Sequence, residues 1–372
     1  MEKNSKSFAP LVSVVMPCYN VEEYLDVAME SVLGQSLEDI EIVCVNDGSK
    51  DSTLSMLRGY SEKDSRVLIV DGPNGGYGKA MNKGMAAASG EYIAILEPDD
   101  FIDREMLQTL YGAAKQWGAD FVKSDYYRFT TDNAGEVIAE PERISSKAEY
   151  YGRPLNPHDN HDLFNMQMMN WTGIYKREFI ETHSIKHHES PGASYQDNGF
   201  WFQAFCWASI IGVVNRPFYY YRQDNASSSI NQDNKVFCMP DEYAWIRDFL
   251  RNNPKLEEEY LSMFHYKKLH NYNFAFSLLA PQYRMPFAER YSREYKDAME
   301  NNELDKTLYW PGEWEQALAL VEGPKQYCDL IEKQNAFDDA RKAGSIGLLK
   351  YHMKYDGLVE TAKIVARKIA RR

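Results

Sequence analysis

Three carboxylates stand together directly after a short apolar run of the sequence. Residues 92–96 form the run, and Glu97, Asp99 and Asp100 follow it. Like charges this close repel each other, and partial burial raises the cost of ionising them. A divalent cation bound to a phosphorylated ligand would offset that cost, because Mg²⁺ typically uses one or two carboxylates plus phosphate oxygens. The alternative is a solvated turn in which Asp100 or Asp103 caps the next helix, and for the cluster alone both interpretations stay open.

The sequence around this cluster alternates strand-like apolar runs with amphipathic helical stretches. We expect strands over residues 11–16, 40–45, 66–70, 92–96 and 119–124, and helices over residues 22–33, 52–60, 79–89 and 104–117. Such alternation predicts an α/β fold, with a mostly parallel sheet and helices on both of its faces. The strands are continuously apolar, which is typical of sheets that are covered on both sides. In sheets of this kind, ligands bind outside the carboxyl ends of the strands.

Polar or glycine-rich residues follow each of the first four predicted strands. They are residues 17–20 (PCYN), residues 46–49 (NDGS), residues 71–76 (DGPNGG) and the acidic cluster. A plain turn would explain any one of them, since Asp-Gly is a favoured turn pair, but four on one sheet edge indicate a ligand site. In that site we expect Asp47 to accept a hydrogen bond from a nucleobase N–H, while Gly48 lets the backbone come close.

The composition limits the classes of protein to which the chain can belong. It has 372 residues, of which 44% are hydrophobic and 26% charged, as in a globular protein. The formal net charge of −13 argues against nucleic acid as a partner, because phosphates require a basic surface. No apolar run approaches the roughly 18 residues of a membrane span. The N-terminus lacks the apolar core of a signal peptide, so we expect a cytoplasmic protein.

The sequence divides into three parts. Residues 1–125 hold the strand–helix alternation, and residues 126–234 are loop-like up to residue 159 and then rich in aromatic side chains. Residues 235–372 have a helical pattern, with helices expected over residues 242–251, 256–279, 288–301, 314–321 and 348–369. The end of the chain, residues 348–372, reads as a basic amphipathic helix. It predicts peripheral contact with an anionic membrane, at its inner face, or else packing of the helix on the protein body.

Four motifs, in order along the chain, resemble the family-two glycosyltransferases, which have the GT-A fold. The motifs are residues 17–20, 46–51, 75–84 and 90–100, and the resemblance covers about residues 10–225. It implies a GT-A domain whose residues 1–125 bind a nucleotide-sugar and whose residues 126–234 hold the acceptor and the catalytic group, followed by an α-helical extension. It also implies inverting transfer of a sugar from a nucleotide-diphosphate donor, with UDP the expected nucleotide. The acceptor would be a hydroxyl of a glycan or lipid-linked molecule in bacterial surface or capsular polysaccharide synthesis.

The resemblance also implies roles for individual residues. Asp99 would bind Mg²⁺ or Mn²⁺. The family usually has Asp where Glu97 stands and Arg where Met81 stands, so Lys79 would replace an arginine contact to phosphate. The residues that would contact the donor are Pro17, Tyr19, Asn20, Asp47, Gly76, Lys79, Asn82, Glu97 and Arg222.

A glycosyl transfer also needs a base. An alcohol is a poor nucleophile until a positioned carboxylate or histidine takes its proton, which contributes roughly 10²- to 10⁴-fold. The family places this carboxylate at the start of a helix in its second half, where this chain has Asp197; a helix N-cap is the alternative role. Trp171 and Trp201 are candidates for stacking on an acceptor sugar, with core packing as the alternative. His187 and His188 lack the HExxH spacing and are expected in a solvated loop.

Two other functions stay open. A different nucleotide-dependent transferase, such as a nucleotidyl transferase, would need a basic phosphate loop near the first strand, and residues 17–24 contain no Lys or Arg. A glycan- or nucleotide-binding protein without catalytic activity is conceivable because Glu97, Gln196 and Met81 all depart from the family pattern.

Overall fold

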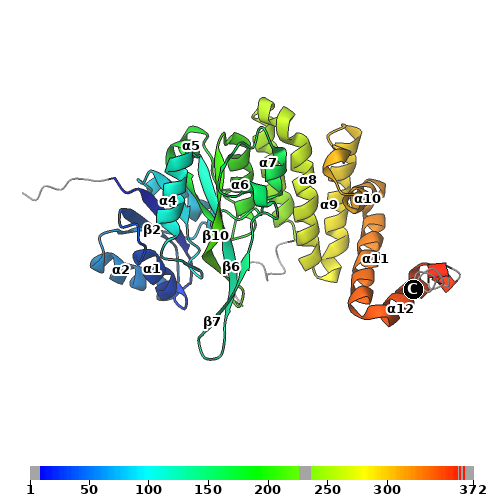
Figure 1. Cartoon of the computed structure of the whole chain (residues 1–372), viewed down its shortest axis with the longest axis horizontal. Helices are drawn as coiled ribbons and strands as arrows, with labels where there is room; N and C mark the ends of the chain where they lie inside the picture. Colours follow the sequence, from blue (N-terminus) through cyan, green and yellow to red (C-terminus); the bar gives the residue numbers. More distant parts are fainter. Residues whose placement is uncertain (1–8, 226–235, 359, 362, 365–372) are drawn as a thin grey trace, which may run out of the picture. The chain divides into compact units, whose positions relative to one another are not determined.

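The computed structural model describes residues 9–225, 236–358, 360–361 and 363–364 (Figure 1). The chain divides into two compact units, Met1–Tyr260 and Leu261–Arg372. The first unit contains the sheet and the helices that cover it, and the second unit is helical. Both the predicted α/β architecture and the predicted helical C-terminal region are thereby confirmed.

One sheet runs through the first unit. In the described residues its strands follow the order β3-β2-β1-β4-β9-β6-β10-β5, while β7 pairs with β6 and β8 with β10. Strand β9 is antiparallel to both β4 and β6, so β6 and β10 run in the same direction as β1 to β4. The carboxyl ends of these six strands therefore meet at one edge. The strand bounds are β1 Val12–Cys18, β2 Ile40–Asp47, β3 Val67–Gly72, β4 Tyr92–Ile95, β5 Phe101–Ile102, β6 Phe121–Thr131, β7 Val137–Glu142, β8 Pro154–Leu155, β9 Gly173–Lys176 and β10 Ile211–Arg222.

Helices cover both faces of the central strands, which are mostly apolar and are buried along their whole length. Every residue of β1, β2 and β4 is buried, as continuous apolar runs predict. Helix α3 packs on β1 and β2, and α4 packs on β6 and β10. Gly84 allows the close approach of α3, since an added Cβ would collide with Val15. The helices of this unit are α1 Leu25–Leu33, α2 Thr53–Lys63, α3 Tyr77–Ala87, α4 Met106–Trp117, α5 Arg177–Thr182, α6 Gln196–Trp207 and α7 Cys238–Arg251.

The loop-like interpretation of residues 126–159 is wrong in part. Strand β6 continues to Thr131 and pairs with β7, and the resulting hairpin projects from the sheet (Figure 1). The residues of β7 are mostly exposed, so no apolar pattern marks them in the sequence. Strand β10 is likewise not predicted, because Asn215, Arg216 and Pro217 interrupt it. The register with β6 shifts at this interruption.

The second unit has an aromatic core. Tyr272, Phe287, Tyr291 and Tyr327 are each 0% exposed. None of the helices in the described part of the chain has the length and apolar character needed to cross a bilayer. The helices are α8 Pro254–Leu278, which begins in the first unit, α9 Pro281–Glu300, α10 Pro311–Glu322, α11 Pro324–Lys342 and α12 Gly344–Tyr355.

The predicted helix over residues 348–369 is confirmed in part, because α12 covers its start and the described residues 357–358, 360–361 and 363–364 are again helical, with an interruption at Asp356. Helix α12 ends at Tyr355, where Asp356 is the C-cap and Gly357 has a φ of +78°. A positive φ is readily adopted by glycine and stops a regular helix. Residues 359, 362 and 365–372, which include part of the basic stretch, lie outside the described residues.

Candidate active site

The carboxyl ends of β1 and β2 are tied together by side-chain hydrogen bonds. Asn20 has a φ of +52°, a conformation that asparagine tolerates. Its Oδ1 accepts from the Lys50 N–H at 2.8 Å, and its own N–H donates to Ser49 Oγ at 3.1 Å. Pro17 is buried, whereas the neighbouring Tyr19 is 44% exposed. The predicted nucleotide-binding segment is thus held in place with Tyr19 at the surface.

Asp47 fixes the turn between β3 and α3. The side chain is 4% exposed, and its two oxygens accept from the backbone N–H groups of Gly75 at 2.8 Å and Gly76 at 2.9 Å. Gly48 has a φ of +72°, and an added Cβ would lie 2.6 Å from Asn74 N, so the turn requires glycine. A nucleobase contact by Asp47 stays a prediction. It would use the lone pairs that these two bonds leave.

Asp100 links β4 to β10. It is 1% exposed, and it accepts hydrogen bonds from the Tyr219 hydroxyl and from the Arg222 N–H, both at 2.8 Å. Its carboxylate is thereby committed to β10, so the interpretation of Asp100 as the cap of the next helix is wrong. Burial raises the pKa of Asp100 well above its usual value, and the charge of Asp99 raises it further.

Glu97 and Asp99 supply the remaining carboxylates of the acidic cluster. Asp99 is partly exposed, and its Oδ2 accepts from Asn225 Nδ2 at 2.8 Å. Glu97 accepts from the Tyr77 hydroxyl at 2.7 Å. Burial raises the pKa of Glu97 to about 8, and the charges of Asp99 and Asp197 add to the effect. With a pKa of about 8, Glu97 is mostly protonated at neutral pH, and a positive charge bound nearby would favour its ionised form.

Glu97 and Asp99 suit a cation that takes most of its ligands from a bound diphosphate and only one or two from the protein. Among the described residues no group of three or more His, Cys, Asp or Glu side chains could form an all-protein metal site. Mg²⁺ typically takes one or two carboxylates together with phosphate oxygens and water. Asp99 can supply one such ligand, and a cation bound beside it would offset part of the cost of ionising Glu97, whose pKa is raised chiefly by burial.

Arg222 is the last residue of β10, and its side chain contacts the backbone of the acidic cluster. Its side chain is 10% exposed. Its Nε donates to the Asp99 carbonyl oxygen at 2.8 Å, and its Nη1 donates to Thr131 Oγ1 at 3.2 Å and Asp224 Oδ1 at 3.1 Å. The guanidinium also packs over the Phe129 ring, 4.6 Å from its centroid. A diphosphate contact by Arg222 stays a prediction.

The start of α3 presents the next set of predicted donor residues. Gly76 precedes the helix with a φ of +89°, and Lys79 is exposed. Met81 is 0% exposed, so the position at which the family has arginine faces the protein core. The Asn82 side chain donates to the His187 carbonyl oxygen and accepts from the His187 N–H, both at 2.9 Å. A donor contact by Asn82 stays a prediction.

Asp197 lies in the first turn of α6. Tyr195, with a φ of +64°, is the N-cap, so Asp197 is inside the helix and not its cap. Burial raises the pKa of Asp197 to about 7, with a further contribution from the charge of Glu242. Backbone N–H groups at the helix start and the Lys123 ammonium act in the opposite direction. A carboxylate with a pKa near 7 suits a general base that works near neutral pH.

The structure corrects three predictions that concern aromatic rings and histidines. Trp171 is 6% exposed and stacks on Tyr219, with ring centroids 4.3 Å apart. Trp201 is 1% exposed and stacks on Phe205, with ring centroids 4.1 Å apart. These rings belong to the core, where protein side chains cover them, and they present no face to an acceptor sugar. His187, expected in a solvated loop, is 0% exposed, and burial lowers its pKa to about 3.

A polar network behind Glu97 was not predicted from the sequence. The Tyr77 hydroxyl donates to Glu97, and the buried Asn170 lies between Tyr77 and His187, with Nδ2 3.4 Å from the hydroxyl and 2.9 Å from His187 Nε2. The His-His-Glu stretch at residues 187–189 is the only trace of this network in the sequence considered alone. Because Tyr77 and Asn170 are 93 residues apart, no spacing rule could connect them.

Gly78 in α3 offers a test of this packing. An added Cβ would collide with the His188 carbonyl oxygen, whereas at Gly112 of α4 nothing lies within 4 Å. Gly78→Ala is therefore expected to lower the free energy of unfolding by about 1–3 kcal/mol. The matched control Gly112→Ala is expected to raise it by about 0.5–1 kcal/mol through helix propensity. Urea unfolding measures both, and equal effects would contradict the close contact at Gly78.

A mostly parallel sheet with polar and acidic residues at the carboxyl ends of its strands places the protein among the α/β proteins that bind their ligands at this edge. The family model described as Glycosyl transferase family 2 matches residues 13–177. EpsH of Bacillus subtilis (strain 168), named as a glycosyltransferase, is 30% identical over 253 residues, which cover 67% of this chain and 72% of EpsH. The chain belongs to glycosyltransferase family 2.

Two further comparisons agree with this assignment. EpsJ of the same organism, also named as a glycosyltransferase, is 31% identical over 217 residues, 58% of this chain and 62% of EpsJ. The alignment thus spans less than two thirds of that relative. The crystal structure of Staphylococcus aureus TarS 1–349 with UDP-GlcNAc is similar with a TM-score of 0.64, covering 87% of this chain and 91% of TarS 1–349 at 18% identity. At this identity the likeness concerns the fold, which is GT-A with a helical C-terminal region.

Proposed function

We propose that the protein is an inverting glycosyltransferase that moves a sugar from a UDP-linked donor to a hydroxyl of a glycan or lipid-linked acceptor. The observation that carries the proposal is the partly buried Asp197 at the start of α6, whose raised pKa suits a base. Its charge also raises the pKa of Glu97 in the acidic cluster, so the two carboxylates share one electrostatic environment. UDP-GlcNAc bound to TarS supports the choice of a UDP-sugar.

In the proposed reaction, Asp197 accepts the proton of the acceptor hydroxyl as its oxygen attacks the anomeric carbon of the donor. The bond from that carbon to the diphosphate oxygen breaks on the opposite face, so the configuration inverts and UDP leaves with the bonding electron pair. Tyr19 and Asp47 orient the nucleotide, and Lys79 and Arg222 face its phosphates. Asp99 would hold a Mg²⁺ or Mn²⁺ ion, which when bound would supply positive charge for the departing diphosphate.

The acceptor assignment rests on the family resemblance. Synthesis of a surface polysaccharide would place the enzyme near the inner face of the membrane, where the basic residues of 348–372 would contact anionic lipid. Each basic residue close to such a surface contributes about 1 kcal/mol of binding free energy. Binding to liposomes that contain phosphatidylglycerol should weaken when residues 351–372 are deleted, and unchanged binding would contradict the membrane contact.

A donor screen tests the proposal directly. The shift in unfolding temperature and the release of free nucleotide are measured with UDP-, GDP- and CMP-sugars in the presence of Mn²⁺. We expect UDP-sugars to stabilise the protein and at least one of them to release UDP. If UDP-sugars raise the unfolding temperature but no nucleotide is released even with glycan acceptors present, the protein binds the nucleotide without catalysis. Release of pyrophosphate would instead support a nucleotidyl transferase.

The pH dependence of the reaction follows from the raised pKa of Asp197. A base must be deprotonated to accept the acceptor proton, so kcat/KM for the donor should rise with pH and level off above pH 7. The apparent pKa of this acid limb is expected at about 7, well above the usual 3.8 of an aspartate. A profile that is flat between pH 5 and pH 8 would contradict the assignment of Asp197 as the base.

A further inference from the structure

The candidate base is carried by a segment that two helices hold. Residues 186–199, which we call the base segment, contain Asp197 and contact both α3 and α7. On α3, the Tyr77 N–H donates to the Gly192 carbonyl oxygen at 2.9 Å, and Asn82 holds the backbone of His187. Within the segment, Gln196 Nε2 donates to Ser190 Oγ at 2.9 Å. The position of Asp197 therefore depends on how this segment is anchored.

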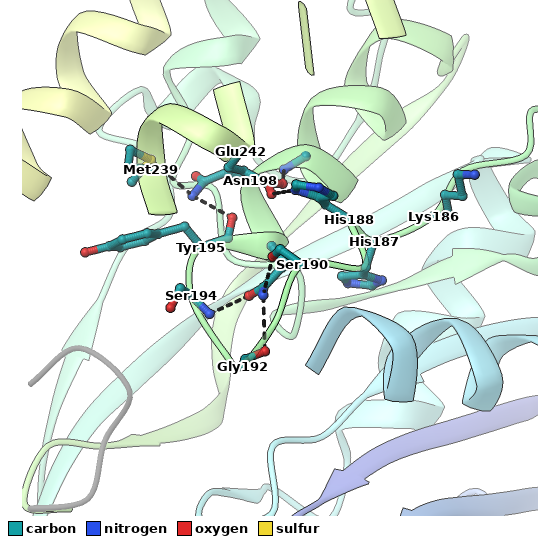
Figure 2. Close-up of polar contacts among 12 residues, drawn as sticks. Lys186, His187, His188, Ser190, Gly192, Ser194, Tyr195, Asn198, Met239 and Glu242 are labelled. Atoms are coloured by element: carbon teal, nitrogen blue, oxygen red, sulfur yellow. Dashed lines mark hydrogen bonds and ion pairs between the residues drawn. The ribbon is translucent and has the colours of Figure 1, made fainter. Parts of the chain in front are cut away.

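On α7, one carboxylate anchors the base segment at two points. Glu242 is 1% exposed, and its Oε1 accepts from the Gly199 N–H at 2.9 Å. Its Oε2 lies 2.9 Å from His188 Nδ1 (Figure 2). The two anchored residues, His188 and Gly199, lie on either side of Asp197 in the sequence. A single side chain of α7 thereby fixes the start and the end of the stretch that contains the base.

The contact is close as well as polar. An added Cβ at Gly199 would collide with Glu242 Oε1 and with the Trp245 ring, so α6 and α7 touch at this point. The His188 ring stacks on Trp245, with centroids 5.3 Å apart and planes within 9° of parallel. Asn198 adds a contact from its Nδ2 to Met239 Sδ of α7 at 3.9 Å (Figure 2). These contacts leave the base segment little freedom to move relative to α7.

A buried carboxylate that holds two segments together costs desolvation free energy. Burial raises the pKa of Glu242, because it disfavours the charged form, and His188 only partly opposes this effect. Well-packed apolar side chains of similar volume often stabilise a fold as well as buried ion pairs or better. A requirement of packing alone therefore does not account for a carboxylate at this position. Its effect on the neighbouring Asp197 offers a functional reason.

We propose that Glu242 is a positioning residue for the glycosyl transfer, a proposal that rests on the proposed function of Asp197. Glu242 holds the base segment so that Asp197 meets the acceptor hydroxyl. Glu242 belongs to α7 and lies outside residues 13–177, which the family model matches. The role thus belongs to a helix beyond the strand-end motifs. It connects α7 to the chemistry at the sheet edge through the backbone of residues 188–199.

Glu242 also acts on Asp197 through its charge. After burial, the negative charge of Glu242 is the largest contribution that raises the pKa of Asp197. Removing that charge without changing the shape of the side chain should lower the pKa of Asp197. The other titratable groups that interact with Asp197 come from several elements, namely Lys123 of β6, Glu97 after β4, Tyr77 of α3, Tyr175 of β9, Tyr221 of β10 and Tyr195 beside α6.

The first experiment measures the anchoring itself and needs no substrate. Amide hydrogen exchange of peptides that cover residues 186–199 is compared in wild type, Glu242→Ala and Asp248→Asn. Asp248 is a carboxylate of the same helix, 67% exposed and 3.4 Å from Arg251, and it serves as the matched control. We expect exchange in the base segment to rise about tenfold or more in Glu242→Ala, since hydrogen bonds to a charged group are the stronger ones and both anchoring contacts are lost. Exchange equal to that of the control would overturn the proposal.

The second experiment separates positioning from a merely structural role. Release of UDP from the best UDP-sugar of the donor screen is measured against pH for wild type, Glu242→Gln and Glu242→Ala. In Glu242→Gln the amide can still accept from Gly199 and donate to His188, so we expect a stable protein whose acid limb moves down by about half a pH unit or more. In Glu242→Ala we expect kcat to fall at least about tenfold, as a displaced catalytic group does, with the Kd for UDP within about twofold. An unshifted acid limb in Glu242→Gln together with an unchanged kcat in Glu242→Ala would overturn the proposal.

The two proposals fail in distinguishable ways. If Asp197→Asn releases UDP at the wild-type rate, or if the wild type releases none, the proposed function of Asp197 fails, while hydrogen exchange still decides whether Glu242 anchors the segment. If Asp197→Asn is inactive and Glu242→Ala retains wild-type exchange and kcat, the base assignment stands and the role of Glu242 fails.

Discussion

Replacing Asp197 by Asn is expected to lower the rate of UDP release from the sugar donor by roughly 10²- to 10⁴-fold, the usual contribution of a general base. The amide has the same shape as the carboxylate but cannot accept the proton of the acceptor hydroxyl. Because it leaves the donor site untouched, the Kd for UDP should stay close to the wild-type value. Steady-state kinetics with the best UDP-sugar from the donor screen, together with UDP titration calorimetry, measures both quantities.

The same variant should be at least as stable as the wild type at pH 8. The pKa of Asp197 is raised from 3.8 to about 7 in the folded protein, so the folded state holds this proton more tightly than the unfolded chain does. Ionised Asp197 therefore destabilises the fold, with no effect below pH 4 and the full effect above pH 7. The Asp197→Asn substitution would relieve this at pH 8, and the unfolding temperature should rise. A loss of activity with a lower unfolding temperature would instead indicate damage to the fold.

The parts of this site that could be predicted from the sequence are those whose residues are close to one another along the chain. The strand ends could be predicted because β1, β2 and β4 are continuously buried and each is followed at once by its polar segment. Asp197 was found through the family pattern at the start of a helix. Its environment was not, because Glu242 and Lys123 come from α7 and β6, and only the folded chain brings their charges to it.

Two of the incorrect predictions, those for Asp100 and Trp171, share a physical origin. Asp100 resembles a helix cap in the sequence because it stands a few residues before α4, yet Tyr219 and Arg222 of a strand more than 100 residues later take both its oxygens. From the sequence, Trp171 is a candidate for stacking on a sugar ring, but in the structure the Tyr219 ring stacks on it. For Asp100 and Trp171 the contacting residues come from β10, the strand whose apolar pattern is interrupted by Asn215, Arg216 and Pro217 and which is therefore not predicted from the sequence.

The second large effect is expected at Asp99, the proposed cation ligand. Asp99→Asn keeps the side-chain shape and the bond from Asn225 can be replaced by an amide–amide contact, but the negative charge is lost. Charge stabilisation by a bound cation is worth several kcal/mol, and each 1.36 kcal/mol is a factor of ten in rate. We therefore expect UDP release to fall by about 10²-fold or more. The concentration of Mn²⁺ that gives half-maximal activity should rise as well.

Metal dependence is what distinguishes this effect from a general change in charge. Asp39→Asn is the matched control, because Asp39 is exposed at the amino end of β2, at the edge of the sheet opposite to the acidic cluster. It should leave both kcat and the requirement for Mn²⁺ unchanged. EDTA should abolish UDP release in the wild type, and Mn²⁺ should restore it. If release survives EDTA, or if Asp99→Asn and Asp39→Asn behave alike, Asp99 is not a cation ligand, and the diphosphate must then be stabilised by cationic side chains such as Lys79 and Arg222.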